Sequence, residues 1–407
     1  MPDSSAIPAF PQGFLWGAST SAHQIEGNNT ASDWWYTEHD GSGLLTEPSG
    51  DAVDSLHRWP EDMDLLAGAG FTDYRFSIEW ARVEPAEGAF SQAMLRFYRA
   101  MVDGALERGL RPLLTLHHFT SPLWFTARGG WAAPDSADYF TRYLAALAPV
   151  LSDDVEYVCT INEPNILAVF SHLKSTGVAN LPHGMPEPDP AVAAGLIRAH
   201  HAARAQLREQ HPRLKVGWSV AMLTYQPEPG AEVAATAYAQ PRQTVFLEAA
   251  RDDDWLGVQS YTRTRIGLDD HGQAIELGPP AGARCTLTGW EYYPDALGHA
   301  VRDAHRISGG IPLIVTENGI ATDDDTLRVD YTAGALQALH AVMDEGVQVR
   351  GYFHWSLVDN YEWGSYTPTF GLVAVDRDTF GRRAKPSLTW LGGITRGANP
   401  DTVASTT

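Results

Sequence analysis

Short runs of apolar and β-branched residues recur along the chain, and longer segments with apolar residues at helical spacing lie between them. The short runs are typical of buried strands, and the longer segments are typical of amphipathic helices. We expect strands at 14–19, 73–78, 112–117, 157–161, 215–220, 255–259, 312–316 and 349–354. We expect helices at 61–70, 91–108, 136–151, 190–210, 238–250, 295–308 and 330–345. Glycines at several helix ends, such as Gly70 and Gly346, indicate left-handed caps.

Eight strands alternating with helices are typical of an α/β fold of the closed (β/α)8 type, the TIM barrel. A doubly wound open sheet is the alternative, and it ordinarily carries a glycine-rich phosphate turn after its first strand. Here that segment, 17–27, reads GASTSAHQIEG and lacks such a turn. We therefore expect a single barrel domain over 1–407, with a core at about 10–395, frayed termini and the active site at the C-terminal ends of the strands.

The net charge of −21 argues against nucleic acid as a partner, because affinity for phosphates comes mainly from Lys and Arg. No segment has the length and apolarity of a membrane span, and the first ten residues do not resemble a secretory signal. We expect a cytoplasmic protein with no membrane partner. Of the two cysteines, Cys159 lies in a predicted strand and is expected to be a small core residue.

Polar side chains occur in or just after seven of the eight predicted strands. In a barrel these positions meet at one mouth, where the chemistry of such folds takes place. Individual residues also have structural interpretations: Arg75 could pair with Glu79, and His117 should point away from its neighbour His118. The residues at this predicted mouth are Gln24, Arg75, Glu79, His117, His118, Asn162, Glu163, Gln259, Tyr261, Glu317, Asn318 and Trp355.

Two glutamates, Glu163 and Glu317, each end a strongly apolar strand and each stand next to an asparagine. A carboxylate buried there without a partner or a function is costly. Paired carboxylates across a cleft suit the cleavage of glycosidic bonds, in which one donates a proton and the other attacks or activates water. Composition alone does not separate this chemistry from a metal-dependent carboxylate site, although no spacing of ligands indicates zinc.

Five motifs resemble glycoside hydrolase family 1, the β-glucosidase family, in the right order and over about residues 10–391. They are FLWGASTSAHQIEG at 14–27, YRFSIEWAR at 74–82, TINEP at 160–164, VTENG at 315–319 and WSLVDNYEW at 355–363. The resemblance implies a (β/α)8 barrel that cleaves terminal β-linked glucose, and also β-galactose or β-fucose, from a small glycoside or oligosaccharide. It implies neither a metal nor an organic cofactor, and the oligomeric state stays open.

The resemblance assigns roles to residues of this sequence by position. Glu163 corresponds to the acid/base and Glu317 to the nucleophile, with Arg75 and Tyr261 orienting the nucleophile and holding it ionised. Trp290 is similar to a platform for the leaving group. The residues that resemble the shell around the terminal sugar are Gln24, His118, Asn162, Trp355, Glu362, Trp363 and Phe370, with Tyr261 beside them.

These roles imply a retaining, double-displacement mechanism. Arg75 and Tyr261 are expected to lower the pKa of Glu317, and the charge of Glu317 is expected to raise the pKa of Glu163. Once a glycosyl ester forms on Glu317, that charge is gone and Glu163 can act as a base toward water. Retention also predicts that the two carboxyl groups lie roughly 5–5.5 Å apart.

The sequence departs from the family pattern in three places, one of which is a slightly short stretch between Trp363 and Phe370. Gln259 stands where the family usually has an asparagine near the sugar O2, and the loop at 171–184 lacks the usual glycine-rich form. Rival interpretations are less favoured. A 6-phospho-β-glycosidase would lack the pair Glu362-Trp363, and a thioglucosidase would lack Glu163. A silent sugar-binding protein would lack one catalytic glutamate, whereas a glycosyl-transferring enzyme is not distinguished.

Overall fold

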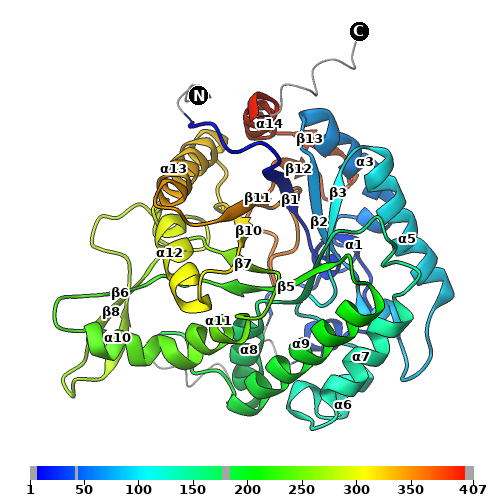
Figure 1. The fold of residues 1–407 in the computed structure, drawn as a ribbon, viewed down its shortest axis with the longest axis horizontal. Helices are drawn as coiled ribbons and strands as arrows, with labels where there is room; N and C mark the ends of the chain where they lie inside the picture. The colour runs from blue at the N-terminus through cyan, green and yellow to red at the C-terminus, as the bar shows by residue number, and fades with distance from the viewer. Residues whose placement is uncertain (1–6, 42–44, 177–183, 399–407) are drawn as a thin grey trace.

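The computed structural model describes residues 7–41, 45–176 and 184–398, and its centre is a closed barrel of parallel strands (Figure 1). The strands are hydrogen bonded around the barrel in the order β1-β11-β10-β7-β5-β4-β3-β2. All eight predicted strands are present and the predicted fold is confirmed. Their bounds are β1 Leu15–Ser19, β2 Asp73–Ser77, β3 Arg111–Thr115, β4 Tyr157–Asn162, β5 Lys215–Ala221, β7 Trp255–Gln259, β10 Leu313–Asn318 and β11 Val349–Trp355.

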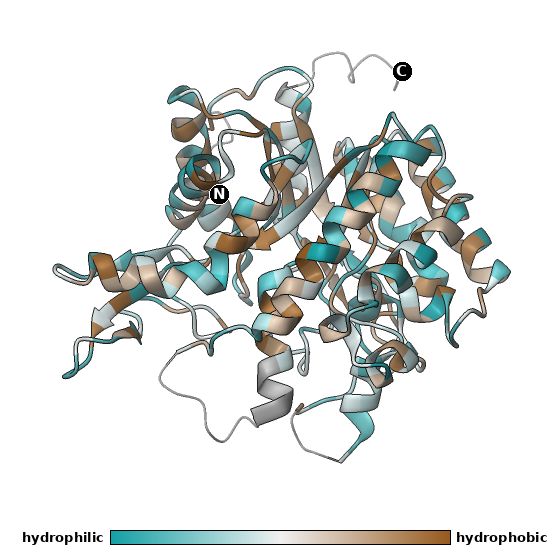
Figure 2. Ribbon diagram, turned by 60° about the horizontal axis from the view of Figure 1, so that its bottom comes forward, coloured by the Kyte–Doolittle hydropathy of each residue, from teal (hydrophilic) through white to brown (hydrophobic). Residues whose placement is uncertain are grey.

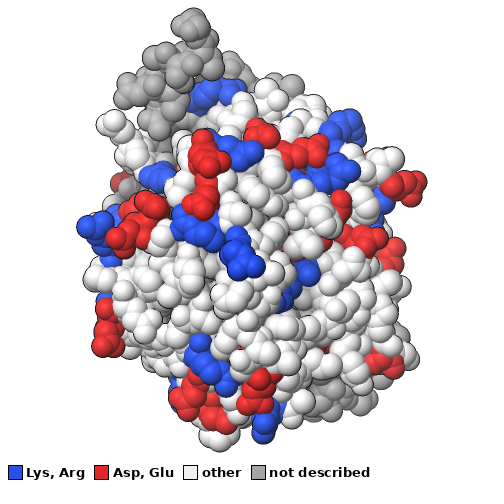
Figure 3. Space-filling view, turned by 90° about the vertical axis from the view of Figure 1, so that its right-hand side faces the viewer, with Lys and Arg blue, Asp and Glu red and all other residues white. Residues whose placement is uncertain are grey.

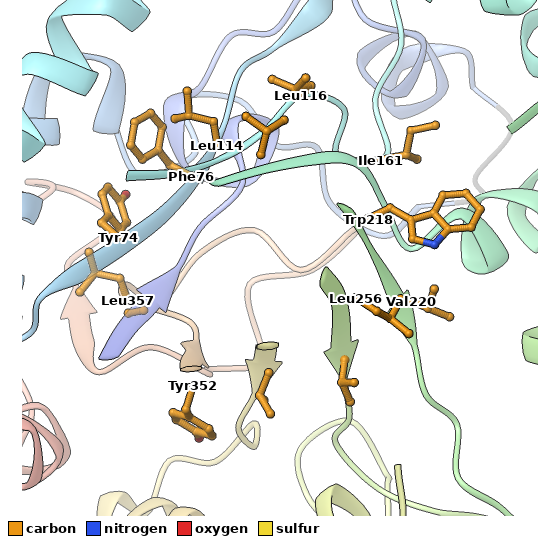
Figure 4. Packing of buried hydrophobic residues seen from close by; sticks show 14 of the residues in the cluster. Tyr74, Phe76, Leu114, Leu116, Ile161, Trp218, Val220, Leu256, Tyr352 and Leu357 are labelled. Atoms are coloured by element: carbon orange, nitrogen blue, oxygen red, sulfur yellow. The ribbon is translucent and has the colours of Figure 1, made fainter. Parts of the chain in front are cut away.

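Successive side chains of a barrel strand point to opposite faces, so alternate residues pack into two separate hydrophobic clusters. One set points outward and packs against the helices, as Phe76, Leu114 and Leu256 do in Figure 4. The other set points inward and fills the barrel. The inward residues are Leu15, Leu113, Tyr157, Cys159, Trp255, Ile314 and Phe353. Cys159 is fully buried and not in a disulfide, as expected of a small core residue.

Helices surround the barrel and place their apolar positions against the strands, so that brown and teal alternate along them in Figure 2. Those that correspond to predicted helices are α3 Ser55–Ala69, α5 Gln92–Glu107, α7 Ser136–Ala146, α9 Pro190–Gln210, α10 Glu232–Ala239, α11 Val245–Ala249, α12 Ala296–Ser308 and α13 Asp325–Asp344. A π-helical turn joins α10 to α11. Gly70, at φ 104°, ends α3 in the predicted left-handed conformation.

Two longer helices, α8 Pro164–Thr176 and α14 Pro386–Ala398, were not among those predicted. Helix α14 continues past the expected end of the core at 395. Its last turn is held because the Arg396 guanidinium donates to the Ala69 carbonyl at 2.5 Å and the Thr395 hydroxyl donates to the Gly70 carbonyl at 2.5 Å. Residues 399–407 lie outside the described part of the chain, so the predicted fraying of the C-terminus stays a prediction.

A small second sheet extends from one side of the barrel beside α10 (Figure 1, left). Its strands are β6 Tyr225–Pro227, β8 Thr264–Leu268 and β9 Ala274–Leu277, in the order β6-β8-β9. Each strand is short and only partly buried, so that no apolar run marks it in the sequence. This sheet matters for function, because it forms an outer wall of the cavity at the barrel mouth.

Acidic and basic side chains are interspersed on the face shown in Figure 3, despite the net charge of −21. Ion pairs lie along α3 or link it to the end of α5, for example Arg58–Glu61 at 3.3 Å and Arg108–Asp64 at 2.6 Å. Such exposed pairs contribute little to stability, so their main effect is on the surface potential. In the part of the chain that the structure describes, no helix combines the length and apolarity needed to cross a membrane.

Candidate active site

The barrel strands place four polar side chains at one mouth, at the C-terminal ends of β2, β4, β7 and β10. Arg75, Asn162, Gln259 and Glu317 are all buried there. The sheet register shifts between Cys159 and Asn162 and again between Val315 and Glu317. Such bulges re-aim the side chains that follow them, and they let these two strands turn a polar residue inward after an apolar run.

Glu163 follows β4 directly and adopts a left-handed backbone conformation, with φ at 43°. A glutamate rarely occupies this region, and strain of this kind is found at functional sites that the surrounding fold holds in place. Here the Glu163 N–H donates to the Ser219 carbonyl of β5 at 2.7 Å. The turn directs the carboxyl into a cavity rather than along the strand, since Glu163 is one of the residues that line it.

Both oxygens of the Glu317 carboxyl accept a hydrogen bond. Arg75 Nη1 donates to Oε1 at 2.6 Å and the Tyr261 hydroxyl donates to Oε2 at 2.5 Å. The alternative pairing of Arg75 with Glu79 is not observed; Glu79 instead accepts from the Thr120 hydroxyl at 2.6 Å. The arrangement fixes the rotation of the carboxyl group and stabilises its anionic form.

The two carboxyl groups differ in their surroundings and therefore in acidity. Burial raises the pKa of Glu163 well above its usual range, and the negative charge of Glu317 raises it further. Burial also raises the pKa of Glu317, while Arg75 and the Tyr261 hydroxyl oppose that rise. The sequence predicts a lowered pKa for Glu317; the two partners act in the expected direction, but burial outweighs them. Glu163 therefore holds its proton more tightly than Glu317 does.

Asn162 is the centre of a network that fixes the protonation of His118. Arg75 Nη2, always a donor, donates to Asn162 Oδ1, so the Asn162 amide nitrogen faces His118 Nε2 at 3.2 Å. Because the amide nitrogen of Asn162 donates, His118 Nε2 must accept. The proton of neutral His118 is therefore on Nδ1. Burial lowers the pKa of His118 well below its usual range and keeps the ring neutral. Nδ1 is buried without a partner among the described residues, which leaves it free to donate to a ligand.

A second set of hydrogen bonds surrounds the Glu362 carboxyl. Trp355 Nε1 donates to Glu362 Oε1 at 3.1 Å and Gln24 Nε2 donates to Oε2 at 3.2 Å. The Ser21 hydroxyl donates to Gln24 Oε1 at 2.7 Å, which fixes the orientation of that amide. Burial raises the pKa of Glu362 to about 8, with a further contribution from the charge of Glu317. Protonated Glu362 can donate one hydrogen bond to a ligand and accept others.

Aromatic rings complete the walls. His118 stacks with Trp355 and Trp363, at centroid distances of 5.9 and 6.1 Å. Tyr261 contacts Phe370 at 5.7 Å and Trp290 at 5.6 Å. Trp290 is 41% exposed and lies at the rim, as a platform for the outer part of a ligand requires.

These groups surround one cavity of about 650 Å³. Glu163, Glu317, Gln259 and most of the sugar-shell residues predicted from the sequence line it. Gln24, Arg75 and Asn162 are fully buried, and each hydrogen bonds a side chain that lines the cavity: Gln24 bonds Glu362, Arg75 bonds Glu317 and Asn162 bonds His118. The sugar contacts of Gln24 and Asn162 stay predictions from the sequence. Within the described ranges, no three His, Cys, Asp or Glu side chains gather in a way that could hold a metal ion.

The outer part of the cavity is mainly apolar and was not foreseen from the sequence. Its apolar wall comes from Ile166 and Phe170 of α8, Met222 and Leu223 after β5, and Leu277 of β9. The charged residues of this lining have partners: Arg263 pairs with Glu291 at 2.8 Å and Arg265 with Glu228 at 2.7 Å, and Glu276 accepts from the Tyr238 hydroxyl at 3.0 Å. No motif marks the residues of the apolar wall, because they come from a helix, a connection after β5 and a strand that are far apart in the sequence. Of the segment 171–184, which the sequence analysis treats as a loop, residues 171–176 form the end of α8 and residues 177–183 lie outside the described part of the chain.

Comparisons with known proteins agree with this geometry. The model of glycosyl hydrolase family 1 matches residues 7–264 and 250–399. β-Glucosidase A of Thermotoga maritima is 30% identical over 96% of this chain and 98% of its own, and the bifunctional β-D-glucosidase/β-D-fucosidase of Bifidobacterium breve is 31% identical over 94% and 97%. The crystal structure of the β-glycosidase BGL167 superposes with a TM-score of 0.86 at 41% identity, over 95% of this chain and 97% of that one. The chain belongs to glycosyl hydrolase family 1.

Proposed function

We propose that the chain is a retaining β-glucosidase in which Glu317 is the nucleophile and Glu163 the acid/base. The observation that carries the assignment is the asymmetry of the two carboxyl groups. Glu317 has both oxygens held by donors, whereas Glu163 faces the cavity and burial keeps it protonated. Family membership, with relatives named β-glucosidases, supports terminal β-D-glucosides as substrates.

In the first step, a carboxylate oxygen of Glu317 attacks the anomeric carbon. The bond from that carbon to the glycosidic oxygen breaks, and the proton of Glu163 passes to the departing oxygen. The product is an α-glucosyl ester on Glu317 and a free alcohol. Loss of the charge on Glu317 removes one of the causes that raise the pKa of Glu163, so the Glu163 carboxylate can now act as a base.

In the second step, Glu163 takes a proton from water as the water oxygen attacks the anomeric carbon. The ester bond breaks, the carboxylate of Glu317 is restored and β-glucose leaves. His118 Nδ1, Glu362 and Trp355 face the sugar in this proposal, while Gln24 and Asn162 hold them in place. The relative from Bifidobacterium breve, named for both activities, extends the proposal to β-fucosides. β-Galactosides, the cytoplasmic location and the single-domain organisation stay predictions from the sequence.

Trapping the covalent intermediate tests both assignments. An activated 2-deoxy-2-fluoro-β-glucoside should label the peptide that contains Glu317, and the Glu317→Ala variant should not be labelled. The Glu163→Ala variant, given azide, should form β-glucosyl azide, because azide attacks the ester without needing a base. Glu345→Gln, a change at an exposed carboxyl paired with Arg302, is the matched control and should behave as wild type. A label on a different carboxyl would contradict the assignment.

A further inference from the structure

Strand β4 carries a bulge just before it reaches the active site. Cys159 belongs to the cluster inside the barrel, whereas Ile161 belongs to the cluster outside it, as does Trp218 of β5 (Figure 4). In a regular strand, residues two apart share a face, so Ile161 would point inward like Cys159. The register against β5 shifts between Cys159 and Asn162. The bulge therefore inserts one outward residue and returns Asn162 to the barrel mouth.

The residue before Ile161, Thr160, is fully buried, and its hydroxyl meets His200 of α9. Thr160 Oγ1 lies 2.7 Å from His200 Nδ1. The other ring nitrogen, Nε2, lies 3.1 Å from Oδ1 of Asp253, so it carries a proton and donates. Asp253 in turn pairs with Arg204 at 2.7 Å. The His200 ring also stacks on Trp218, with the centroids 4.1 Å apart. The imidazole is thus fixed in place and links the bulge of β4 to α9 and β5.

The hydroxyl, imidazole and carboxylate of this cluster follow the order of a Ser-His-Asp triad, but the cluster is not a second active site. Thr160, His200 and Asp253 are all buried, and none of them lines the cavity. A substrate cannot reach the hydroxyl. Any effect on catalysis has to pass through the strand that the cluster holds.

Glu163 depends on the backbone of β4 more than its neighbour Asn162 does. The Asn162 side chain is held by hydrogen bonds with three other side chains. No described residue donates to the Glu163 carboxyl. Its position is set by the left-handed turn and by the hydrogen bond from its N–H to the Ser219 carbonyl. A change in the bulge would therefore displace Glu163 while Asn162 stays anchored.

We propose that His200 is a positioning residue for proton transfer: through Thr160 it fixes the bulge of β4 and so keeps the Glu163 carboxyl within reach of the glycosidic oxygen. This inference rests on the proposed function, since it takes Glu163 as the acid/base. A general acid has to lie within about 3 Å of the atom that it protonates. A misplacement of about 1 Å by a remote change can cost up to about 100-fold in rate.

The test compares phenyl β-glucoside, whose leaving group needs a proton, with 2,4-dinitrophenyl β-glucoside, whose leaving group does not. Thr160→Val replaces the hydroxyl by a methyl group of similar size and removes the bond to His200. For the phenyl glucoside, kcat/KM should fall about tenfold, and for the dinitrophenyl glucoside it should change by less than about twofold. Thr160→Ser keeps the hydroxyl and should keep the wild-type ratio of the two values.

Three further variants isolate the route of the effect. In a Glu163→Ala background, Thr160→Val should have no further effect on either substrate, because the displaced carboxyl is gone. Thr395→Val, which removes a buried threonine hydroxyl bonded within α14, is the matched control and should lower stability without changing the ratio. His200→Phe, which keeps an aromatic ring but cannot bond Thr160, should give the same selective loss and serves if Thr160→Val does not fold.

Equal losses on both substrates, no loss on the phenyl glucoside, or a loss that persists in the Glu163→Ala background would each overturn the proposal. A merely structural role for His200 would lower stability and leave the ratio unchanged, which also contradicts it. Failure of the proposed function has a different signature, because Glu163→Ala would then lower kcat/KM equally for the two substrates.

Discussion

Replacing Tyr261 by phenylalanine should shift the acid side of the pH–rate profile to higher pH. The Tyr261 hydroxyl donates to Glu317 Oε2 at 2.5 Å, and the phenylalanine ring preserves the contact with Phe370. Only the hydrogen bond to the nucleophile is lost. Because that bond stabilises the anionic form of Glu317, its removal raises the pKa of this carboxyl.

The size of the shift follows from the type of hydrogen bond. A hydrogen bond to a charged group contributes about 1.5–3 kcal/mol, and one pKa unit corresponds to about 1.36 kcal/mol. The pKa of Glu317 should therefore rise by about one to two units. Arg75 keeps its own bond to Oε1, so Glu317 still ionises, and the enzyme should regain activity as the pH rises.

The assay is the pH dependence of kcat/KM for an aryl β-glucoside, whose two limbs report the ionisation of the free enzyme. Activity needs ionised Glu317, so it falls as the pH drops below the pKa of that residue. Activity also needs protonated Glu163, so it falls on the alkaline side. The alkaline limb should move little, because Glu317 is charged there in both proteins.

Tyr74→Phe is the matched control, since it removes another buried hydroxyl, bonded to Thr20 at 2.8 Å, without touching Glu317. It should lower stability by about 1 kcal/mol and leave the profile in place. An unmoved acid limb in Tyr261→Phe, with reduced activity at every pH, would refute the electrostatic role of Tyr261. An equal shift in the control would refute it as well.

Three further predictions concern the acid, the outer cavity and a buried arginine. Glu163→Ala should lower kcat/KM for cellobiose by about 10²–10⁴-fold but affect 2,4-dinitrophenyl β-glucoside far less, because that leaving group departs without a proton. The apolar outer wall should favour alkyl and aryl glucosides over cellobiose, and Trp290→Ala should reduce kcat/KM for an aryl glucoside about tenfold in the same assay. Buried Arg328 donates to four backbone carbonyls. Arg328→Met should therefore lower the free energy of unfolding, measured in urea, by about 3–5 kcal/mol. Arg306→Met, at an exposed site, is the control and should leave it almost unchanged.

The barrel was predictable because its strands are buried on both faces and read as short apolar runs between amphipathic helices. Val158–Ile161 and Leu313–Thr316 show this most clearly. The small sheet was not predictable in this way. Its strands are short and partly exposed, and the hairpin of Thr264–Leu268 and Ala274–Leu277 is formed by residues whose polarity does not alternate clearly.

The sequence indicates which residues meet at the site, but not which of them hydrogen bond one another. Strand ends meet at the mouth of a barrel, so Glu163, Glu317 and Arg75 could be expected there together. The sequence does not show that the Gln259 amide donates to Asn162, because this depends on a register shift in β4 and on the length of the Gln259 side chain. Nor does it show that burial outweighs the donors around Glu317. The separation of the two catalytic carboxyl groups stays a prediction.

The most direct test of the account is the anomer of the first glucose released from p-nitrophenyl β-D-glucoside, followed by NMR before mutarotation. Two displacements at the anomeric carbon, the first by Glu317, predict that β-glucose appears first in wild type. Glu317→Ala should then release no β-glucose. If α-glucose appears first in wild type, one displacement by water takes place, and Glu317 is not the nucleophile.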